Sequence, residues 1–297
     1  MTSRSHVAGE SIAYVKGAQG LRLAADLAGP SDGSLVILLH GGGQTRHSWS
    51  DAQRRLAEAG YRVIAYDARG HGDSDWSATG DYAFASLADD LREVLAYGGR
   101  PAALVGASLG GITSMMALAG DSPPPCWALA LVDVVPRMNL DGRARVLEFM
   151  AAYPEGFASI DEAIEAISAY LPHRAGRPKA ALGAMKNLRM RQGRFYWHWD
   201  PAFLKNRLTD LPFAGLESTL QSGIFPVLLV RGGLSDVVTE GDAQSFAAAV
   251  PKAEISVITG AAHMVAGDRN DAFGSVILSF LRRAHDSLGS TEAVRGR

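Results

Sequence analysis

The chain has almost no cysteine and no long hydrophobic run. Cys126 is the one cysteine among 297 residues, so no disulfide can form within the chain. A chain of this length buries roughly 75% of the surface that its unfolded form exposes, which holds a fold together without a disulfide or a structural metal. A lone thiol fits a reducing compartment, and the first residues lack the apolar core of a signal peptide. We therefore expect a cytoplasmic protein.

The chain also has little net charge and no metal-ligand pattern. The formal net charge is -2, which favours neither nucleic acid nor an anionic membrane surface. No apolar stretch approaches the ~20 residues that cross a membrane. The HxHxDH spacing of metal lactonases is absent, and no other close group of histidines and carboxylates indicates a ligand set. We expect no nucleic-acid partner, no membrane partner, no metal and no organic cofactor.

Short apolar runs alternate with helical patterns along most of the chain. The runs, nearly continuous in apolar residues, cover 35–39, 61–66, 102–105, 127–135, 226–230 and 255–258. Helical patterns cover 49–59, 86–97, 111–119, 243–250 and 272–284. Strands buried on both faces have this composition, and the alternation is typical of helices on both sides of a parallel sheet. The sequence predicts an α/β fold with a mostly parallel, doubly wound sheet, to which residues 11–15 and 21–27 add an antiparallel pair at the edge.

The alternation stops for about ninety residues in the second half of the chain. Short amphipathic stretches with interspersed prolines replace it, and a segment this long is not a loop of a compact domain. We expect a core from 1–136 and 224–285, an inserted helical cap at 137–223, and a flexible tail at 286–297.

The motif GxSxG occurs once in a context that gives it chemical meaning. Residues 106–111 read Gly-Ala-Ser-Leu-Gly-Gly, directly after the run 102–105 and before a helical pattern. A nucleophile on a sharp turn from strand to helix needs small neighbours, and the helix start directs free N–H groups at an oxyanion. We therefore predict Ser108 as the nucleophile. The plainer alternative is a serine that only caps the helix.

A second glycine-rich loop follows the run 35–39, where residues 40–43 read His-Gly-Gly-Gly. In a sheet of this kind that loop supplies one oxyanion N–H, and the residue after the nucleophile supplies the other. The amides of Gly42 and Leu109 are the expected pair. A dinucleotide-binding turn, with Asp67 after the next strand, is the rival interpretation, but its third glycine would fall at position 46, which is Arg46.

A serine hydroxyl needs a base, and histidine suits that role near neutral pH. His263 follows the run 255–258 just before the terminal helix, and we predict it as the base. Its second ring nitrogen needs an acceptor. We predict Asp236, which follows the run 226–230, with Asp133 at the end of the preceding run as the alternative acid. His40 and His71, in glycine-flanked loops, are expected to fix backbone.

With these motifs the chain resembles the α/β-hydrolase fold superfamily, in its capped serine esterase, epoxide-hydrolase-like and cofactor-free haloperoxidase branch. The resemblance extends from about residue 11 to residue 284. It implies acyl transfer, because epoxide hydrolases and haloalkane dehalogenases carry aspartate at the elbow, where this chain has Ser108. The matching segments are 40–43, 67–74, 106–111, the turn to Asp236, and His263 with residues 267–268.

The predicted activity is hydrolysis of a carboxylic ester, lactone or thioester through an acyl-enzyme on Ser108, with a small molecule as the substrate. A perhydrolase or haloperoxidase-type activity is one alternative, and a non-catalytic ligand-binding protein on the same scaffold is another. In the cap, residues 195–200 crowd aromatic side chains together. Trp197, His198 and Trp199 are either a substrate pocket or the packing between cap and core.

Overall fold

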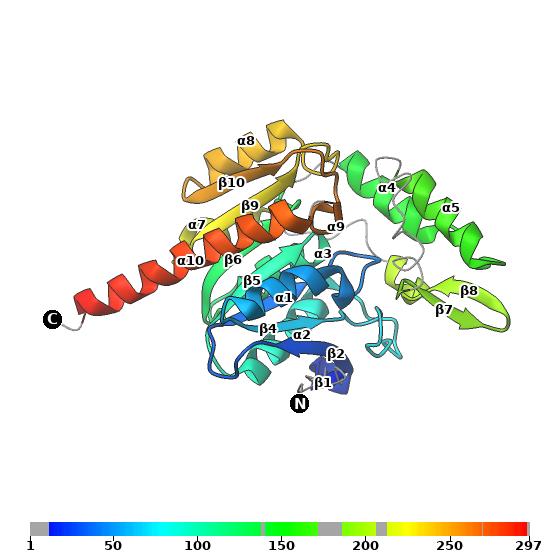
Figure 1. The fold of residues 1–297 in the computed structure, drawn as a ribbon, viewed down its shortest axis with the longest axis horizontal. Helices are drawn as coiled ribbons and strands as arrows, with labels where there is room; N and C mark the ends of the chain where they lie inside the picture. Colours follow the sequence, from blue (N-terminus) through cyan, green and yellow to red (C-terminus); the bar gives the residue numbers. More distant parts are fainter. Residues whose placement is uncertain (1–11, 138–139, 172–185, 206–212, 269, 296–297) are drawn as a thin grey trace, which may run out of the picture.

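The computed structural model describes residues 12–137, 140–171, 186–205, 213–268 and 270–295. An eight-stranded sheet runs through the molecule in the order β1-β2-β4-β3-β5-β6-β9-β10 (Figure 1). β1 and β2 pair antiparallel, as do β2 and β4, and every other pairing is parallel. The expected α/β fold is confirmed. The strands are β1 Ala13–Lys16, β2 Arg22–Ala28, β3 Leu35–Leu39, β4 Arg62–Tyr66, β5 Ala102–Ala107, β6 Cys126–Val132, β9 Val227–Gly232 and β10 Ala253–Ile258.

Helices cover both faces of the sheet and bury a separate core on each. Leu35, Ile37 and Leu39 of β3 belong to the core under α2, α3, α7 and α8. Val36 and Leu38 belong to the core under α1 and α10. This two-sided burial explains why the strand sequences are apolar without alternation. The helices are α1 Ser50–Glu58, α2 Phe84–Gly98, α3 Leu109–Leu118, α7 Phe213–Ser222, α8 Glu240–Ala249, α9 Val265–Asp268 and α10 Asn270–Arg295, with short 3-10 turns η1 Ala18–Gly20 and η2 Arg46–Trp49.

The insertion between β6 and β9 contains a β-hairpin that the sequence analysis did not predict. Helices α4 Leu140–Ala151 and α5 Ile160–Tyr170 are followed by β7 Leu188–Arg191, β8 Arg194–Trp197 and the 3-10 turn η4 Pro201–Leu204, and α4, α5 and the hairpin lie together beside the main sheet (Figure 1). Gln192 and Gly193 join the two strands with φ of 50° and 79°. Positive φ at both loop residues is the geometry of a tight type I′ turn.

Two segments differ from the expected boundaries. Helix α7 lies within the expected cap range 137–223, but its Leu216 and Leu220 are buried in the main core, so this helix packs with the body. Helix α10 continues to Arg295, so residues 286–295, expected as a flexible tail, extend the terminal helix away from the sheet (Figure 1). No helix in the described ranges is long and apolar enough to cross a membrane.

The hairpin side of the insertion is attached to the loop that follows β4. Arg189 of β7 forms an ion pair of 2.7 Å with Asp73, and the guanidinium of Arg191 lies 4.6 Å from the ring centre of Trp76. Such contacts are individually weak at the surface, with cation–π pairs worth about 0.5–1 kcal/mol. Together they set the position of β7 on the body.

Candidate active site

Ser108 stands on a strained turn between β5 and α3. Its backbone has φ 46° and ψ -111°, a region that residues other than glycine rarely adopt and that clusters at functional sites. The turn is tight enough to require its glycines: a Cβ at Gly106 would lie 2.5 Å from the backbone of Gly110, and a Cβ at Gly110 would lie 2.4 Å from the carbonyl oxygen of Leu39. The backbone N–H of Ser108 donates to the carbonyl of Val132 at 3.1 Å, which places Ser108 beside the end of β6.

His263 lies in the loop between β10 and α9 and is bound to a carboxylate. Its Nδ1 is 2.8 Å from Oδ2 of Asp133. Asp133 follows β6 directly, has φ 51° and is completely buried. Its Oδ1 accepts the N–H of Gly232 at 3.0 Å, and its Oδ2 accepts the hydroxyl of Ser235. A buried carboxylate costs much less free energy when several donors satisfy it.

The partner of His263 is therefore Asp133, and the expectation for Asp236 needs correction. The carboxylate of Asp236 pairs with Arg145 of α4 and is 46% exposed. The tight turn after β9 explains the difference, because Ser235 N–H donates to the carbonyl of Gly232 at 3.0 Å. In that conformation the Ser235 side chain reaches inward to the buried carboxylate, and the next side chain reaches outward to the cap.

The glycine-rich loop after β3 lies against the nucleophile. A Cβ at Gly41 would be 3.5 Å from the Cβ of Ser108. The N–H of Gly41 donates to Oε1 of Gln44 at 3.0 Å, and the N–H of Gly43 donates to Nε2 of His71 at 3.2 Å. Gly42 stands between these two anchored amides, so the orientation of its peptide is fixed from both sides.

The two amides expected to bind an oxyanion have no partner elsewhere in the described ranges. Neither the N–H of Gly42 nor that of Leu109 makes a hydrogen bond to a described residue. Leu109 is the first residue of α3, where backbone N–H groups have no acceptor within the helix and the helix dipole favours negative charge.

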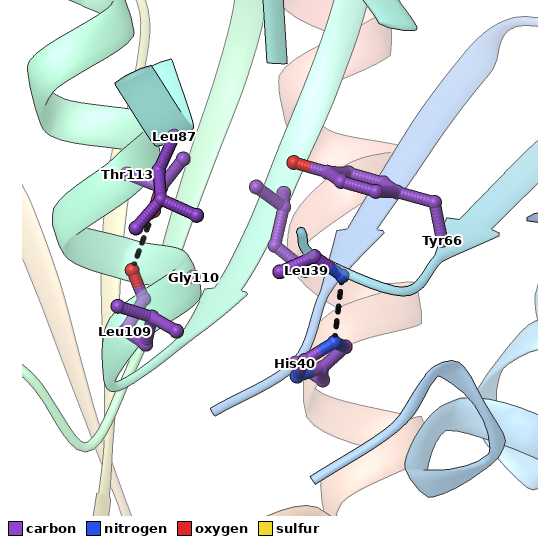
Figure 2. Close-up of a pocket in the computed structure, with 8 residues that line it drawn as sticks. Leu39, His40, Tyr66, Leu87, Leu109, Gly110 and Thr113 are labelled. Atoms are coloured by element: carbon purple, nitrogen blue, oxygen red, sulfur yellow. Dashed lines mark hydrogen bonds between the residues drawn. The ribbon is translucent and has the colours of Figure 1, made fainter. Parts of the chain in front are cut away.

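Three buried histidines fix backbone around the site. Nε2 of His40 accepts the N–H of Ala68 at 2.9 Å, and its Nδ1 is 2.8 Å from the carbonyl of Gly41; burial lowers its pKa. The dashed line that begins at His40 in Figure 2 marks the first of these hydrogen bonds. Together with the bond from Gly43 to His71, these contacts confirm the expectation that His40 and His71 hold the loops.

His198 is the third of these histidines and joins the insertion to the body. Its Nδ1 accepts the N–H of Gly72 at 2.8 Å, and its Nε2 is 3.4 Å from the carbonyl of Gly43. Burial lowers the pKa of His198 to about 3, so its ring is neutral near pH 7. His198 therefore bridges two glycine-rich loops as a neutral donor and acceptor.

The tryptophans of the aromatic stretch pack within the insertion. The rings of Trp197 and Trp199 stack at 4.9 Å, and Phe157 meets Trp197 edge-on at 4.9 Å. The indole N–H of Trp197 donates to the carbonyl of Ala152 at 3.1 Å. These contacts agree with the packing interpretation for Trp197. One edge of the Trp199 ring reaches the glycine-rich loop after β3, where a Cβ at Gly43 would lie 3.4 Å from it.

A small cavity lies beside the start of α3 (Figure 2). Its volume of about 10 Å³ is room for roughly one water molecule, which is too little for an acyl group. The side chains that line it are mostly apolar, with the hydroxyl-bearing Tyr66 and Thr113 among them. The lining residues are Leu39, His40, Tyr66, Ala68, Leu87, Leu109, Gly110 and Thr113.

Asp67 has a structural role that excludes the dinucleotide interpretation. Its side chain is fully buried, and its carboxylate accepts the backbone N–H of Arg46 at 2.6 Å as well as the guanidinium of the same residue. A carboxylate enclosed in this way is not free to bind a ribose hydroxyl. Arg46, at the position where the fingerprint requires glycine, is its buried ion-pair partner.

The family model for the alpha/beta hydrolase fold matches residues 34–269, which include the elbow, His263 and both aspartates. The chain belongs to the α/β-hydrolase family. Among its relatives, the esterase Rv0045c of Mycobacterium tuberculosis is 30% identical over 258 residues, which are 83% of this chain and 82% of the relative. The sn-1-specific diacylglycerol lipase ABHD11 of Mus musculus is 30% identical over 262 residues, covering 83% and 80%.

Solved structures of other α/β-hydrolases agree with the fold. A structure of the M. tuberculosis esterase Rv0045c superposes with a TM-score of 0.73 at 28% identity over 92% of each chain. E-2-(acetamidomethylene)succinate hydrolase superposes with a TM-score of 0.79, covering 92% of this chain and 99% of that chain. Its identity is 22%, so this second likeness concerns the fold alone.

Three residues of this α/β-hydrolase site were not identified from the sequence. Ser235 binds the carboxylate of Asp133, and Gln44 anchors the N–H of Gly41. Met150 of α4 lies above the glycine-rich loop, where a Cβ at Gly42 would be 3.5 Å from its sulfur. The sequence did contain a signal for the first two residues: Ser235 directly precedes Asp236, and Gln44 directly follows Gly43. Nothing in the sequence of α4 distinguishes Met150 from its neighbours.

Proposed function

We propose that the protein is a serine hydrolase that cleaves a carboxylic ester, lactone or thioester of a small molecule. In this proposal Ser108 is the nucleophile, His263 is the general base and Asp133 is the acid that orients His263. The observation that carries it is the hydrogen bond of 2.8 Å between His263 and the buried Asp133 at the sheet edge where Ser108 occupies its strained turn. A histidine oriented by a carboxylate is the arrangement that activates a serine hydroxyl.

The proposed reaction uses the hydrogen bond between His263 and Asp133. With Nδ1–H donated to Asp133, the free Nε2 takes the proton of Ser108 as its oxygen attacks the substrate carbonyl. The same nitrogen then returns the proton to the leaving alcohol or thiol, which leaves an acyl group on Ser108. A water molecule that loses a proton to His263 next attacks the acyl-enzyme. The bond between the acyl carbon and Ser108 Oγ then breaks, His263 gives its proton to Oγ, and the product acid departs.

The N–H groups of Gly42 and Leu109 are the proposed oxyanion hole. Both amides belong to anchored backbone, one between the bonds at Gly41 and Gly43 and one at the first residue of α3. Donors that are already oriented stabilise the negative oxygen of the tetrahedral intermediate without reorganising, and each is worth about 10²–10³ in rate.

The relatives support an ester as the bond that is cleaved. Rv0045c is described as an esterase and ABHD11 as a diacylglycerol lipase. Over a shorter region, 140 residues of this chain are 31% identical to protein phosphatase methylesterase 1 of Mus musculus. All three are named as enzymes that act on esters, and their names share no single substrate, so they favour the reaction type over any one substrate.

A fluorophosphonate probe tests this proposal directly. We expect the probe to label the protein stoichiometrically on Ser108, because the phosphonyl group mimics the tetrahedral intermediate in the proposed oxyanion hole. Mass spectrometry of the labelled peptide identifies the residue, and Ser108→Ala is the control that should remain unlabelled. Absence of labelling in the folded wild-type protein, or labelling of another serine, would contradict the proposal.

We also propose that α4, α5, the β7–β8 hairpin and η4 form a cap that limits which acyl groups reach Ser108. Met150 and Phe203 lie beside the proposed oxyanion donor, since a Cβ at Gly42 would be 3.5 Å from Met150 Sδ and 4.0 Å from the Phe203 ring. Two ion pairs attach the insertion to the body, Arg145 of α4 with Asp236 and Arg189 of β7 with Asp73. We expect side chains this close to Gly42 to contact the substrate around its carbonyl.

Met150→Ala is expected to increase kcat/KM for longer acyl esters relative to acetyl esters by at least about tenfold. One methylene in a pocket already alters specificity by roughly 10–200-fold, and this substitution removes three heavy atoms. The measurement is a series of p-nitrophenyl esters of increasing acyl length. Trp197→Ala is the comparison: its ring packs inside the insertion, so it should lower the melting temperature and leave the ranking unchanged. An unchanged ranking in Met150→Ala would place the acyl group elsewhere.

A further inference from the structure

The hydrogen bonds around the Ser235 hydroxyl leave its proton a single acceptor. The residue is only 8% exposed. Its Oγ accepts the backbone N–H of Val237 at 3.2 Å and that of Val238 at 3.3 Å. Because a hydroxyl oxygen has two acceptor positions and one proton, both acceptor positions are taken by the turn. The proton is left to donate to Oδ2 of Asp133.

The donors around Asp133 hold its carboxylate in one orientation. Oδ1 accepts the N–H of Gly232 at 3.0 Å, while Oδ2 accepts both the hydroxyl of Ser235 and the Nδ1–H of His263. The shared oxygen Oδ2 faces the catalytic histidine. A hydrogen bond to that oxygen therefore fixes its direction and reduces the negative charge that His263 experiences.

We propose that Ser235 is a positioning residue of the catalytic triad, which aims the carboxylate of Asp133 at His263 and moderates its charge. This inference rests on the proposed function, because it assigns Ser235 a role in the same reaction. It also gives the turn after β9 a role in catalysis, since the turn supplies Gly232 and Ser235 as donors to an acid that comes from β6.

Ser235→Ala tests the inference through rate and pH dependence together. We expect kcat to fall by roughly tenfold to hundredfold, which corresponds to the free energy of one hydrogen bond to a charged group, with KM nearly unchanged. We also expect the acid limb of the kcat/KM profile to move to higher pH. With one donor fewer, Asp133 presents more negative charge to His263 and favours the protonated ring, which cannot act as base.

Three companion variants separate positioning from simple stability. Ser235→Thr keeps the hydroxyl and should restore most of the rate and the wild-type acid limb. Ser235→Cys keeps the shape with a weaker donor, so its kcat should fall between wild type and alanine, and it serves if alanine does not fold. Ser222→Ala removes a serine hydroxyl from the exposed end of α7, where it donates only to the carbonyl of Ser218, and should change neither rate nor pH profile.

The outcomes distinguish this inference from the proposed function. If Ser235→Ala and Ser235→Cys keep the wild-type kcat and acid limb and lose only thermal stability, Ser235 is a structural residue of the turn and the inference is overturned. If instead Ser108→Ala retains activity, the proposed function itself fails. A dead Ser108→Ala beside an unaffected Ser235→Ala would reject the inference alone.

Discussion

Alanine at Ser108 is expected to lower kcat by about a millionfold on any ester that the wild-type protein hydrolyses, and alanine at His263 by a similar factor. Without the histidine the serine is not activated, and without the serine the histidine has no nucleophile to activate. Either substitution therefore removes the acyl-enzyme pathway, and members of a triad act as a unit. Initial rates on an activated p-nitrophenyl ester, with substrate in excess, measure both effects. Circular dichroism spectra and melting temperatures establish that the variants remain folded.

The double variant Ser108→Ala/His263→Ala gives the sharper control. If the two side chains serve one pathway, the double variant should be no slower than either single variant. Losses that multiply would show that the two residues act independently. A single variant that keeps more than about a tenth of the rate would show that its residue is outside the mechanism.

Asp133→Asn is expected to lower kcat by roughly 10⁴, whereas Asp236→Asn should lower it less than tenfold. An asparagine amide at position 133 no longer holds Nδ1–H of His263 and favours the wrong tautomer, in which Nε2 carries the proton and cannot accept another. Asp236 contacts Arg145 of the cap, and surface ion pairs of this kind contribute about 1 kcal/mol or less. Steady-state kinetics of both variants on one ester provide the comparison.

Arg145→Gln is the matched control for this pair of variants. It removes the same ion pair from the other side, so Arg145→Gln and Asp236→Asn should have the same small effect, mainly on KM. A severe loss of kcat in Asp236→Asn with a mild one in Asp133→Asn would return the acid to position 236. The hydrogen bond between His263 and Asp133 would then have to rearrange during the reaction.

The order of strands and helices in the main sheet could be predicted from the sequence, because strands buried on both faces are apolar at nearly every position. Strands such as Leu35–Leu39 are apolar at every position, and no other local structure of that length and composition fits between helices. Ser108 and His263 were predicted as nucleophile and base because each follows such a strand. Their loops begin at the same edge of the sheet, so position along the chain implied position in space.

The acid could not be chosen by the same argument. Asp133 and Asp236 both follow strands that end at this edge, and the choice depends on which side chain of a tight turn is directed inward. Ser235 takes the inward position by accepting two backbone amides, and the adjacent Asp236 is left on the outside. Which of the two side chains is directed inward is set by hydrogen bonds within the turn, and the apolar pattern of the strands does not predict these hydrogen bonds.

The hairpin of the insertion was missed for a related reason. Its strands have four residues each, and a short two-stranded ribbon is marginal without tertiary support. That support comes from distant parts of the chain: Asp73 for Arg189 and Trp76 for Arg191. Long-range contacts of this kind override local propensity.

The hydrogen bond between Asp133, after β6, and His263, after β10, has a consequence for β9. In the sheet β9 lies between β6 and β10, so the acid and the base come from strands roughly 10 Å apart, twice the usual spacing. Their side chains have to meet across the end of β9. That end is Gly232, and a Cβ there would lie 2.3 Å from the carbonyl oxygen of Ala262, next to His263. The intervening strand must finish without a side chain, which makes Gly232 a steric requirement of the bridge between Asp133 and His263.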